Sequence, residues 1–226
     1  MLEALFNLIF PKICYACGDA ISGSVQHICL SCRGDLAKID TQDFTNNKIQ
    51  QLFWGRLELE KASSYLKFEQ YGKTQRLLHA LKYKGVKEVG ITLGELAAIE
   101  LMEKGFFHEI DLLLPIPIHR IKNKKRGYNQ SHYIAEGIAN ISNIPIDKTS
   151  LFKNVNTKSQ TKKNRFERFE NVTRTFELVQ PRQLENKHVL LIDDVVTTGA
   201  TIEACGNTLR NINGIRLSLL TIASTY

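Results

Sequence analysis

The sequence has no hydrophobic run that approaches the roughly 18 residues needed to cross a bilayer, so it offers no candidate membrane-spanning helix. It also lacks internal repeats and low-complexity segments, which excludes solenoids and collagen-like chains. With 43% hydrophobic and 23% charged residues, its composition is not that of a disordered chain. A length of 226 residues favours one medium domain with a small appendage.

The amino terminus lacks the features of a secretion signal. Residues 1–10 read M-L-E-A-L-F-N-L-I-F: they include Glu3, have no basic lead, and stop at Pro11 without a small-residue cleavage site. We expect a short helix that packs on the body of the protein. We also expect a cytoplasmic location.

Positive charge is concentrated in two stretches. The chain holds 30 Lys and Arg against 23 Asp and Glu, a net charge of +7. Residues 118–126 contain five basic side chains and no acid, and residues 153–168 contain six basic side chains and one acid. These stretches sum to +10, so the rest of the chain sums to −3. Two cationic loops on a nearly neutral globule indicate a local anion site, although solvated cationic faces or contacts to nucleic-acid phosphates are alternatives.

Four of the five cysteines form two C-x2-C pairs that are eleven residues apart: Cys14, Cys17, Cys29 and Cys32. Two such knuckles complete a tetrahedral site, and in a reducing compartment this spacing favours metal over disulfides. Gly18 suits the tight knuckle turn, and His27 is a possible substitute ligand. Four thiolates leave no open position on the metal, so we predict a structural zinc ion in a ribbon-like module over residues 1–50.

The remaining residues, 51–226, alternate between helical and strand patterns, which predicts an α/β domain with a parallel sheet flanked by helices. Short apolar runs predict strands over Asp111–Ile116, His188–Ile192 and Arg216–Ala223. Apolar residues at helical spacing predict helices over Gln75–Tyr83, Glu88–Lys104, Gln130–Ile141 and Thr201–Ile212.

The most informative stretch is V-L-L-I-D-D-V-V-T-T-G-A-T at residues 189–201. Asp193 and Asp194 come at the carboxyl end of a buried strand, where open α/β sheets place their ligands. The T-T-G-A-T turn then leads into a helix whose free N–H groups, with two hydroxyls and a glycine, form a cup for a phosphate. Carboxylates beside such a cup suit a ribose 5-phosphate. The alternative is a solvated loop followed by an ordinary helix cap.

This stretch resembles the phosphoribosyl pyrophosphate (PRPP) signature of the type I phosphoribosyltransferase fold. The wider pattern resembles the ComF/GntX family, which is linked to bacterial competence and DNA uptake. The matching pieces are the cysteine pairs, L-K-Y-K-G at 81–85, P-I-P-I-H at 115–119, R-G-Y-N-Q at 126–130, and Gln160 to Asn171 leading to Phe176. One departure is Lys153, where the family pattern leads us to expect an arginine with its planar fork.

The resemblance implies roles for individual residues. Asp193 and Asp194 would be the catalytic carboxylates and hold the ribose hydroxyls, directly or through Mg2+-bound water. The cup residues would bind the 5-phosphate: Thr197, Thr198, Gly199, Ala200 and Thr201. Cations would meet the pyrophosphate: Lys82, Arg120, Arg126, Lys162 and Arg165. The second basic stretch matches the position of a mobile loop that excludes water during reaction.

Two functions are compatible with the sequence. The first is a PRPP- and Mg2+-dependent transferase that attaches a phosphoribosyl group to an unknown nitrogen acceptor. The second is a non-catalytic protein of the same fold that binds single-stranded DNA or a DNA-uptake helicase. The acceptor would be recognised by a hood made from the zinc module and residues 53–72. The aromatic residues there could stack on a base or pack in the core: Phe53, Trp54, Tyr65, Phe68 and Tyr71.

Overall fold

The computed structural model describes residues 12–21, 27–153 and 175–226. The helices of these residues are α2 (Leu30–Gly34), α3 (Lys48–Leu52), α4 (Lys73–Tyr83), α5 (Lys87–Glu103), α6 (Arg120–Arg126), α7 (Gln130–Ser142), the 3-10 helix η1 (Pro181–Leu184) and α9 (Ala200–Leu209). The strands are β1 (Ala62–Lys67), β2 (Leu112–Pro115), β3 (Leu151–Lys153), β4 (Phe176–Leu178), β5 (His188–Val196) and β6 (Arg216–Ser224).

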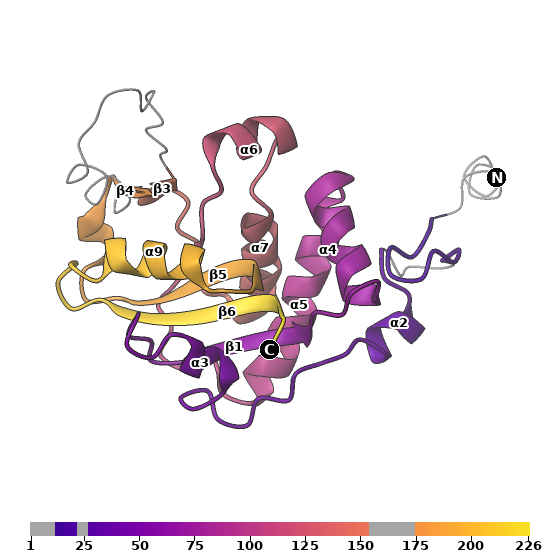
Figure 1. The fold of residues 1–226 in the computed structure, drawn as a ribbon, viewed down its shortest axis with the longest axis horizontal. Helices are drawn as coiled ribbons and strands as arrows, with labels where there is room; N and C mark the ends of the chain where they lie inside the picture. The colour runs from indigo at the N-terminus through magenta and orange to yellow at the C-terminus, as the bar shows by residue number, and fades with distance from the viewer. Residues whose placement is uncertain (1–11, 22–26, 154–174) are drawn as a thin grey trace.

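The centre of the molecule is a four-stranded parallel sheet in the order β1-β6-β5-β2 (Figure 1). The long central pair, β5 and β6, runs in register from His188 opposite Arg216 to Val196 opposite Ser224. A separate antiparallel pair joins β3 to β4. Because parallel strands end at a common edge, the residues that follow β5 lie beside those that follow β2 and β6.

Both faces of the sheet are covered, which explains why its central strands are continuous apolar runs. Leu190 and Ile192 contribute to a core shared with α4, α5 and α7. Val189 and Leu191 point to the opposite core, which includes residues of α3 and α9. Figure 1 shows α3 and α9 on the near side of the sheet, with α5 and α7 behind it.

Helices α5 and α7 approach closely because glycines face each other at their contact. A Cβ atom on Gly94 would lie 2.2 Å from the Ile134 carbonyl oxygen, and one on Gly137 would lie 2.0 Å from that of Ile91. Real Cβ atoms do not make such contacts, so this helix pair requires both glycines. The pair in turn fixes the start of α7, which reaches the carboxyl edge of the sheet.

The predicted fold class, a parallel sheet flanked by helices with clustered cysteines near the amino terminus, is confirmed. The three predicted strands and four predicted helices are present, with ends shifted by a few residues. The strand predicted over His188–Ile192 continues to Val196, so Asp193 and Asp194 belong to β5 itself. Strand β1 was not predicted.

The interpretation of residues 118–126 as a loop was wrong, because most of this stretch is helix α6. Its caps are local: His119 Nδ1 accepts a hydrogen bond from Ile121 N at 3.0 Å, and Gly127 ends the helix with φ of 80°. Lysine and arginine are good helix formers, and three of them in the last turn complement the helix dipole. The segment lacks buried residues, so it shows no apolar period that would reveal a helix.

Within residues 53–72, which we expect to contribute part of the hood, β1 is the edge strand of the main sheet and pairs with β6. Phe53 and Tyr65 are buried core residues, as the packing alternative predicted. Trp54 and Tyr71 are instead 60% and 78% exposed. No helix in the described part of the chain is both long and apolar enough to cross a membrane.

Candidate functional site

The paired carboxylates lie near the carboxyl end of β5, where two other elements, α7 and α4, meet them. Ser131 Oγ, in the first turn of α7, donates to Asp193 Oδ1 at 3.0 Å. The same oxygen accepts from the backbone N of Asp194 at 2.9 Å. Lys82 Nζ, in the last turn of α4, lies 2.7 Å from Asp194 Oδ2, and the Asp194 side chain is only 5% exposed. The sequence had placed Lys82 near this site, and the structure brings it into direct contact.

The environment of Asp193 perturbs its protonation. Burial raises the pKa of Asp193 most, and the neighbouring charge of Asp194 adds to this effect. The hydrogen bonds from Asp194 N and Ser131, together with the charge of Lys82, act in the opposite direction. The balance raises the pKa of Asp193 from 3.8 to about 7. A carboxyl group with such a pKa exchanges a proton near neutrality and gains from any cation or hydrogen-bond donor that enters the site.

Lys82 is held in place by the R-G-Y-N-Q segment that joins α6 to α7. The buried Tyr128 hydroxyl donates to the carbonyl oxygen of Leu81, the residue before Lys82. Arg126 donates to Gln130 Oε1, and its guanidinium lies 5.5 Å from the centre of the Tyr83 ring. The L-K-Y-K-G and R-G-Y-N-Q segments are therefore two sides of one contact, which sets the position of the lysine opposite the carboxylates.

The T-T-G-A-T turn after β5 leads into α9 through a left-handed glycine. Gly199 is buried and has φ of 76°, the left-handed region that favours glycine. The side chains around it are exposed: Thr197, Thr198, Ala200 and Thr201. The backbone N of Ala200 lies 3.5 Å from Thr198 Oγ1 and begins α9, a helix of ten residues. The turn thus presents hydroxyl groups and the amino end of a helix to solvent at the edge of the sheet.

A cavity of about 610 Å³ lies beside the end of β2, with Arg120 and Lys153 in its lining. Lys153 Nζ lies 4.9 Å from the centre of the Phe176 ring. Burial lowers the pKa of Lys153, while the charge of Asp193 opposes this change. Lys153 therefore interacts electrostatically with Asp193, but it lacks the planar fork of an arginine.

The structure thus brings together Asp193, Asp194 and Lys82, with Arg126 one contact further away. Arg120 begins α6 and is exposed. Lys162 and Arg165, together with the rest of the second basic stretch after Lys153, lie outside the described residues. Sequence reasoning missed Ser131, although it directly follows the R-G-Y-N-Q motif and lies at the start of a predicted helix.

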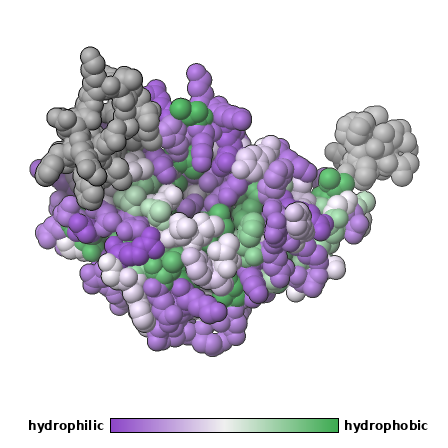
Figure 2. Space-filling model, in the orientation of Figure 1, coloured by the Kyte–Doolittle hydropathy of each residue, from purple (hydrophilic) through white to green (hydrophobic). Residues whose placement is uncertain are grey.

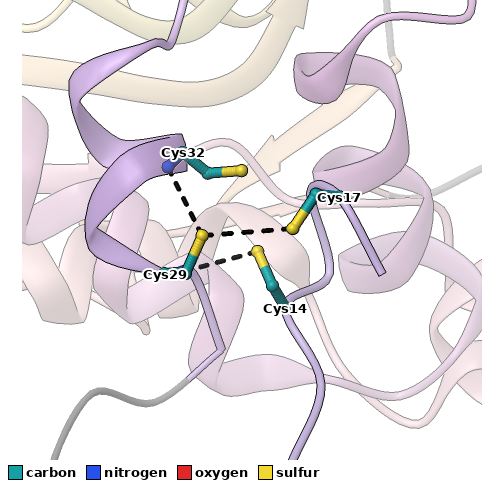
Figure 3. A group of neighbouring side chains, drawn as sticks. All are labelled: Cys14, Cys17, Cys29 and Cys32. Atoms are coloured by element: carbon teal, nitrogen blue, oxygen red, sulfur yellow. Dashed lines mark hydrogen bonds between the residues drawn. The ribbon is translucent and has the colours of Figure 1, made fainter. Parts of the chain in front are cut away.

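The four cysteines form one compact cluster (Figure 3). Their sulfur atoms all lie within 4.8 Å of one another, and Cys17 Sγ is 4.0 Å from Cys29 Sγ. Tetrahedral zinc with Zn–S bonds of about 2.3 Å requires sulfurs roughly 3.8 Å apart, so the cluster fits this ion. His27 is not part of the cluster; its ring stacks on Tyr15 with centroids 6.2 Å apart.

Backbone N–H groups stabilise negative charge on these sulfurs. Burial acts to raise the pKa of Cys14, but N–H groups of Cys29, Cys17 and Ala16 outweigh it and lower that pKa to about 6. Burial and the neighbouring thiols raise the pKa of Cys32. Closely packed thiols resist ionising together unless a cation compensates their charge, which is the role of the metal in such sites.

Curated relatives match the chain at 26% identity. Competence protein F of Haemophilus influenzae matches over 141 residues, 60% of this chain and 61% of that protein. Competence protein ComFC of Bacillus subtilis matches over 205 residues, 88% of this chain and 79% of that protein. DNA utilization protein YhgH of Escherichia coli matches over 129 residues, 56% of each. The matched part therefore spans about three fifths or less of the first and third relatives. No protein-family model matches the chain.

Two solved structures are similar to part of the chain at low scores. One is an allosteric regulatory enzyme of purine biosynthesis, with 21% identity, a TM-score of 0.39, and coverage of 58% of this chain and 26% of that one. The other is a hypoxanthine phosphoribosyltransferase from Staphylococcus aureus, with 15% identity, a TM-score of 0.36, and coverage of 61% and 64%.

Proposed function

We propose that this chain, a member of the ComF family, binds PRPP or a related ribose 5-phosphate at the end of β5. The reason is that two carboxylates lie beside a turn that suits a phosphate. One observation carries the proposal. Asp193 and Asp194 lie at the end of a central parallel strand, and the turn that follows leads through the left-handed Gly199 into α9. A ligand with a diol at one end and a phosphate at the other satisfies both halves of this arrangement.

The roles of the residues follow from their positions. Asp193 and Asp194 would accept hydrogen bonds from the ribose hydroxyls, directly or through water bound to Mg2+. The turn from Thr197 to Thr201 would bind the 5-phosphate with its hydroxyl and N–H groups. Oxygen donors at the end of β5 fit Mg2+, which prefers such ligands and keeps part of its water shell. When bound, the ion would neutralise part of the charge of the pyrophosphate group.

The proposed reaction is transfer of the phosphoribosyl group to a nitrogen acceptor, with release of pyrophosphate. The leaving group carries about three negative charges, so it requires cations. Lys82 is the cation nearest the carboxylates, with Arg126 and Arg120 on α6 further away. Lys162 and Arg165 would join them from the second basic stretch. The nitrogen acceptor is left open by this proposal.

Calorimetry with PRPP and Mg2+ tests the proposal on zinc-loaded protein. We expect saturable binding by the wild-type chain and at least about tenfold weaker binding by an Asp193→Asn/Asp194→Asn variant. Asp40→Asn is a matched control, because Asp40 is also an ion-paired aspartate but does not belong to the proposed site, and its side chain is 70% exposed. Equal binding by the double variant and the control would refute the site, and release of pyrophosphate in a nucleobase screen would identify the acceptor.

A second candidate function is binding of single-stranded DNA by the exposed face of α6. This helix carries four exposed cations, Arg120, Lys122, Lys124 and Lys125. In Figure 2 the surface at the place of α6 is mostly hydrophilic. Two relatives are competence proteins and a third is a DNA utilization protein. Contacts between these cations and phosphates would weaken steeply with salt. Unchanged affinity after all four are replaced by glutamine would refute this role.

We assign a structural zinc ion to the cysteine cluster. Four thiolates close the coordination sphere, so the ion would stabilise the module and take no part in the reaction. The module is joined to the site through α4, since Arg76 Nη1 donates to the Ala16 carbonyl oxygen at 3.0 Å between the first two cysteines. Helix α4 ends about two turns later at Lys82 and Tyr83.

A further inference from the structure

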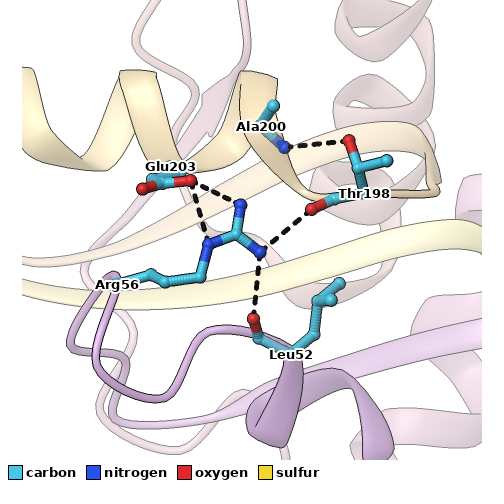
Figure 4. A network of polar contacts seen from close by, with 5 residues as sticks. All are labelled: Leu52, Arg56, Thr198, Ala200 and Glu203. Carbon is cyan, nitrogen blue, oxygen red and sulfur yellow. Dashed lines mark hydrogen bonds and ion pairs between the residues drawn. The ribbon is translucent and has the colours of Figure 1, made fainter.

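Arg56 makes four hydrogen bonds that join the end of α3 to the turn after β5 (Figure 4). Its Nε and Nη2 atoms donate to Glu203 Oε2 in the first turn of α9, at 3.0 and 2.5 Å. Its Nη1 atom donates to two carbonyl oxygens, that of Leu52 at 3.2 Å and that of Thr198 at 3.0 Å. The guanidinium therefore contacts the turn at the Thr198 oxygen and α9 at the Glu203 carboxylate, while its bond to the Leu52 oxygen fixes it to the end of α3.

The contact with the Thr198 carbonyl determines where a donor of the cup points. The peptide bond between Thr198 and Gly199 is planar and trans, so its N–H points opposite to its C=O. Because the Thr198 oxygen points toward Arg56, the Gly199 N–H points away from Arg56. Rotation of this peptide would move the N–H as far as it moves the oxygen. Arg56 thus holds one backbone donor in a fixed orientation.

The same segment supports the turn by packing. Phe53 is 1% exposed, and a Cβ atom on Gly199 would lie 2.8 Å from Phe53 Cε1. The Arg56 guanidinium also lies 5.9 Å from the centre of the Phe53 ring. Residues 52–56 therefore touch the turn at the Thr198 oxygen, at the Gly199 backbone, and at the Glu203 carboxylate. These contacts restrict the backbone of the cup before any ligand binds.

The energy of the ion pair itself is small, so its geometry is the more important property. The Arg56 and Glu203 side chains are 34% and 31% exposed, and pairs this accessible contribute at most about 1 kcal/mol to folding. A lysine would keep the charge but could not donate to Glu203 and to the two carbonyls in one plane. The structure therefore gives a reason for an arginine at this position that net charge does not.

We propose that Arg56 is a positioning residue for the 5-phosphate, acting through the Thr198–Gly199 peptide. This inference rests on the proposed function, because it names a residue that shapes the same site. Arg56 lies outside the motifs that indicated the site, and it is 142 positions before its partner Thr198 in the chain. Its role is to keep N–H groups of the cup preorganised, which lowers the cost of ordering them around a phosphate.

Calorimetry with two separate ligands tests this role, namely ribose 5-phosphate and inorganic pyrophosphate, on the full zinc-loaded chain. Arg56→Lys is expected to weaken ribose 5-phosphate binding about tenfold and to leave pyrophosphate binding within about twofold. Arg216→Lys is the matched control, because Arg216 also pairs with an exposed glutamate, Glu109, at 3.2 Å but lies at the opposite end of β6. Unchanged ribose 5-phosphate binding in Arg56→Lys, or an equal loss for both ligands, would overturn the inference.

Amide hydrogen exchange provides a second measurement that needs no ligand. Peptides that cover residues 197–203 are expected to exchange several-fold faster in Arg56→Lys than in the wild type or in Arg216→Lys. Glu203→Gln keeps the contact to Thr198 and should have the smaller effect. If the wild type fails to bind ribose 5-phosphate, the proposed function is refuted, and the exchange comparison still decides whether Arg56 orders the turn. Equal exchange in all variants would overturn the positioning role.

Discussion

Replacement of Asp193 by asparagine is expected to stabilise the folded protein at pH 8, although it removes a carboxylate from the proposed site. Asparagine has nearly the same shape and keeps an oxygen that can accept from Ser131 Oγ and from the backbone N of Asp194. It differs in carrying no charge at any pH. The substitution therefore isolates the energetic consequence of an ionisable group at this half-buried position.

The magnitude follows from the pKa of Asp193, which burial and the adjacent Asp194 raise from 3.8 to about 7. Below pH 3.8 the carboxyl group is protonated in both states and costs nothing. Between these two pKa values the unfolded chain releases the proton while the folded chain keeps it, so stability falls as pH rises. At about 1.36 kcal/mol for each pH unit, the loss above pH 7 is as much as about 4 kcal/mol. Asp193→Asn should recover this energy.

Urea unfolding of the wild type and the variant between pH 4 and pH 9, in buffer without Mg2+, measures the difference. The two midpoints should coincide near pH 4 and separate by roughly 1 to 2 M urea at pH 8, with the variant higher. Asp40→Asn is a control of opposite sign, because the hydrogen bond from Lys104 lowers the pKa of Asp40. That variant loses a small stabilisation above pH 4. A wild type that is more stable than Asp193→Asn at pH 8, or a difference that does not change with pH, would refute the reasoning.

Three further perturbations address other parts of the structure. Cys14→Ser should lower both the melting temperature and the amount of bound zinc measured by mass spectrometry. Cys205→Ser changes a fully buried thiol outside the cluster and should leave the bound zinc unchanged. Equal amounts of zinc in both variants would contradict the assignment. Lys82→Met should destabilise the fold by about 2 kcal/mol in urea unfolding, because it leaves a buried carboxylate unpaired, and an unchanged midpoint would contradict this. Gly199→Ala should lower the free energy of unfolding by about 2 kcal/mol, because Gly199 has a φ of 76° and lies against Phe53. Gly105→Ala should lower it by about 1 kcal/mol, because Gly105 has a φ of 72° but open space around it. Equal losses of stability would show that the contact with Phe53 does not matter.

The parts of the fold that could be predicted are those in which local sequence and tertiary structure agree. The run V-L-L-I at 189–192 is apolar throughout because β5 is covered on both faces, and the carboxylates that follow lie among the last residues of the strand, which ends at Val196. The cysteine spacing likewise fixed a four-sulfur cluster without knowledge of the fold. In each case the signal lies within a short segment, so no distant contact was needed to recognise it.

The parts that could not be predicted depend on contacts between distant segments. Strand β1 reads A-S-S-Y-L-K, and Ser63 and Ser64 are fully buried. Because serine is polar, this segment lacks the hydrophobic pattern by which a core strand is recognised. Helix α6 had the opposite problem, because none of its residues is buried and it shows no apolar face. Arg56 was missed since its partners, Thr198 and Glu203, lie more than 140 residues away in the sequence.

The cations near the site divide into two groups that the net charge does not distinguish. Lys82 pairs with Asp194, and Arg126 is bonded to Gln130 and stacked on Tyr83, so these two already belong to the inner structure of the site. The four exposed cations of α6 are accessible to solvent, where their charge is available to a polyanion. A small pyrophosphate ligand needs the first group close to the carboxylates, whereas a DNA strand needs only the second. The two proposed functions therefore draw mainly on different side chains and share only Arg120 among these residues, so the two proposals are compatible.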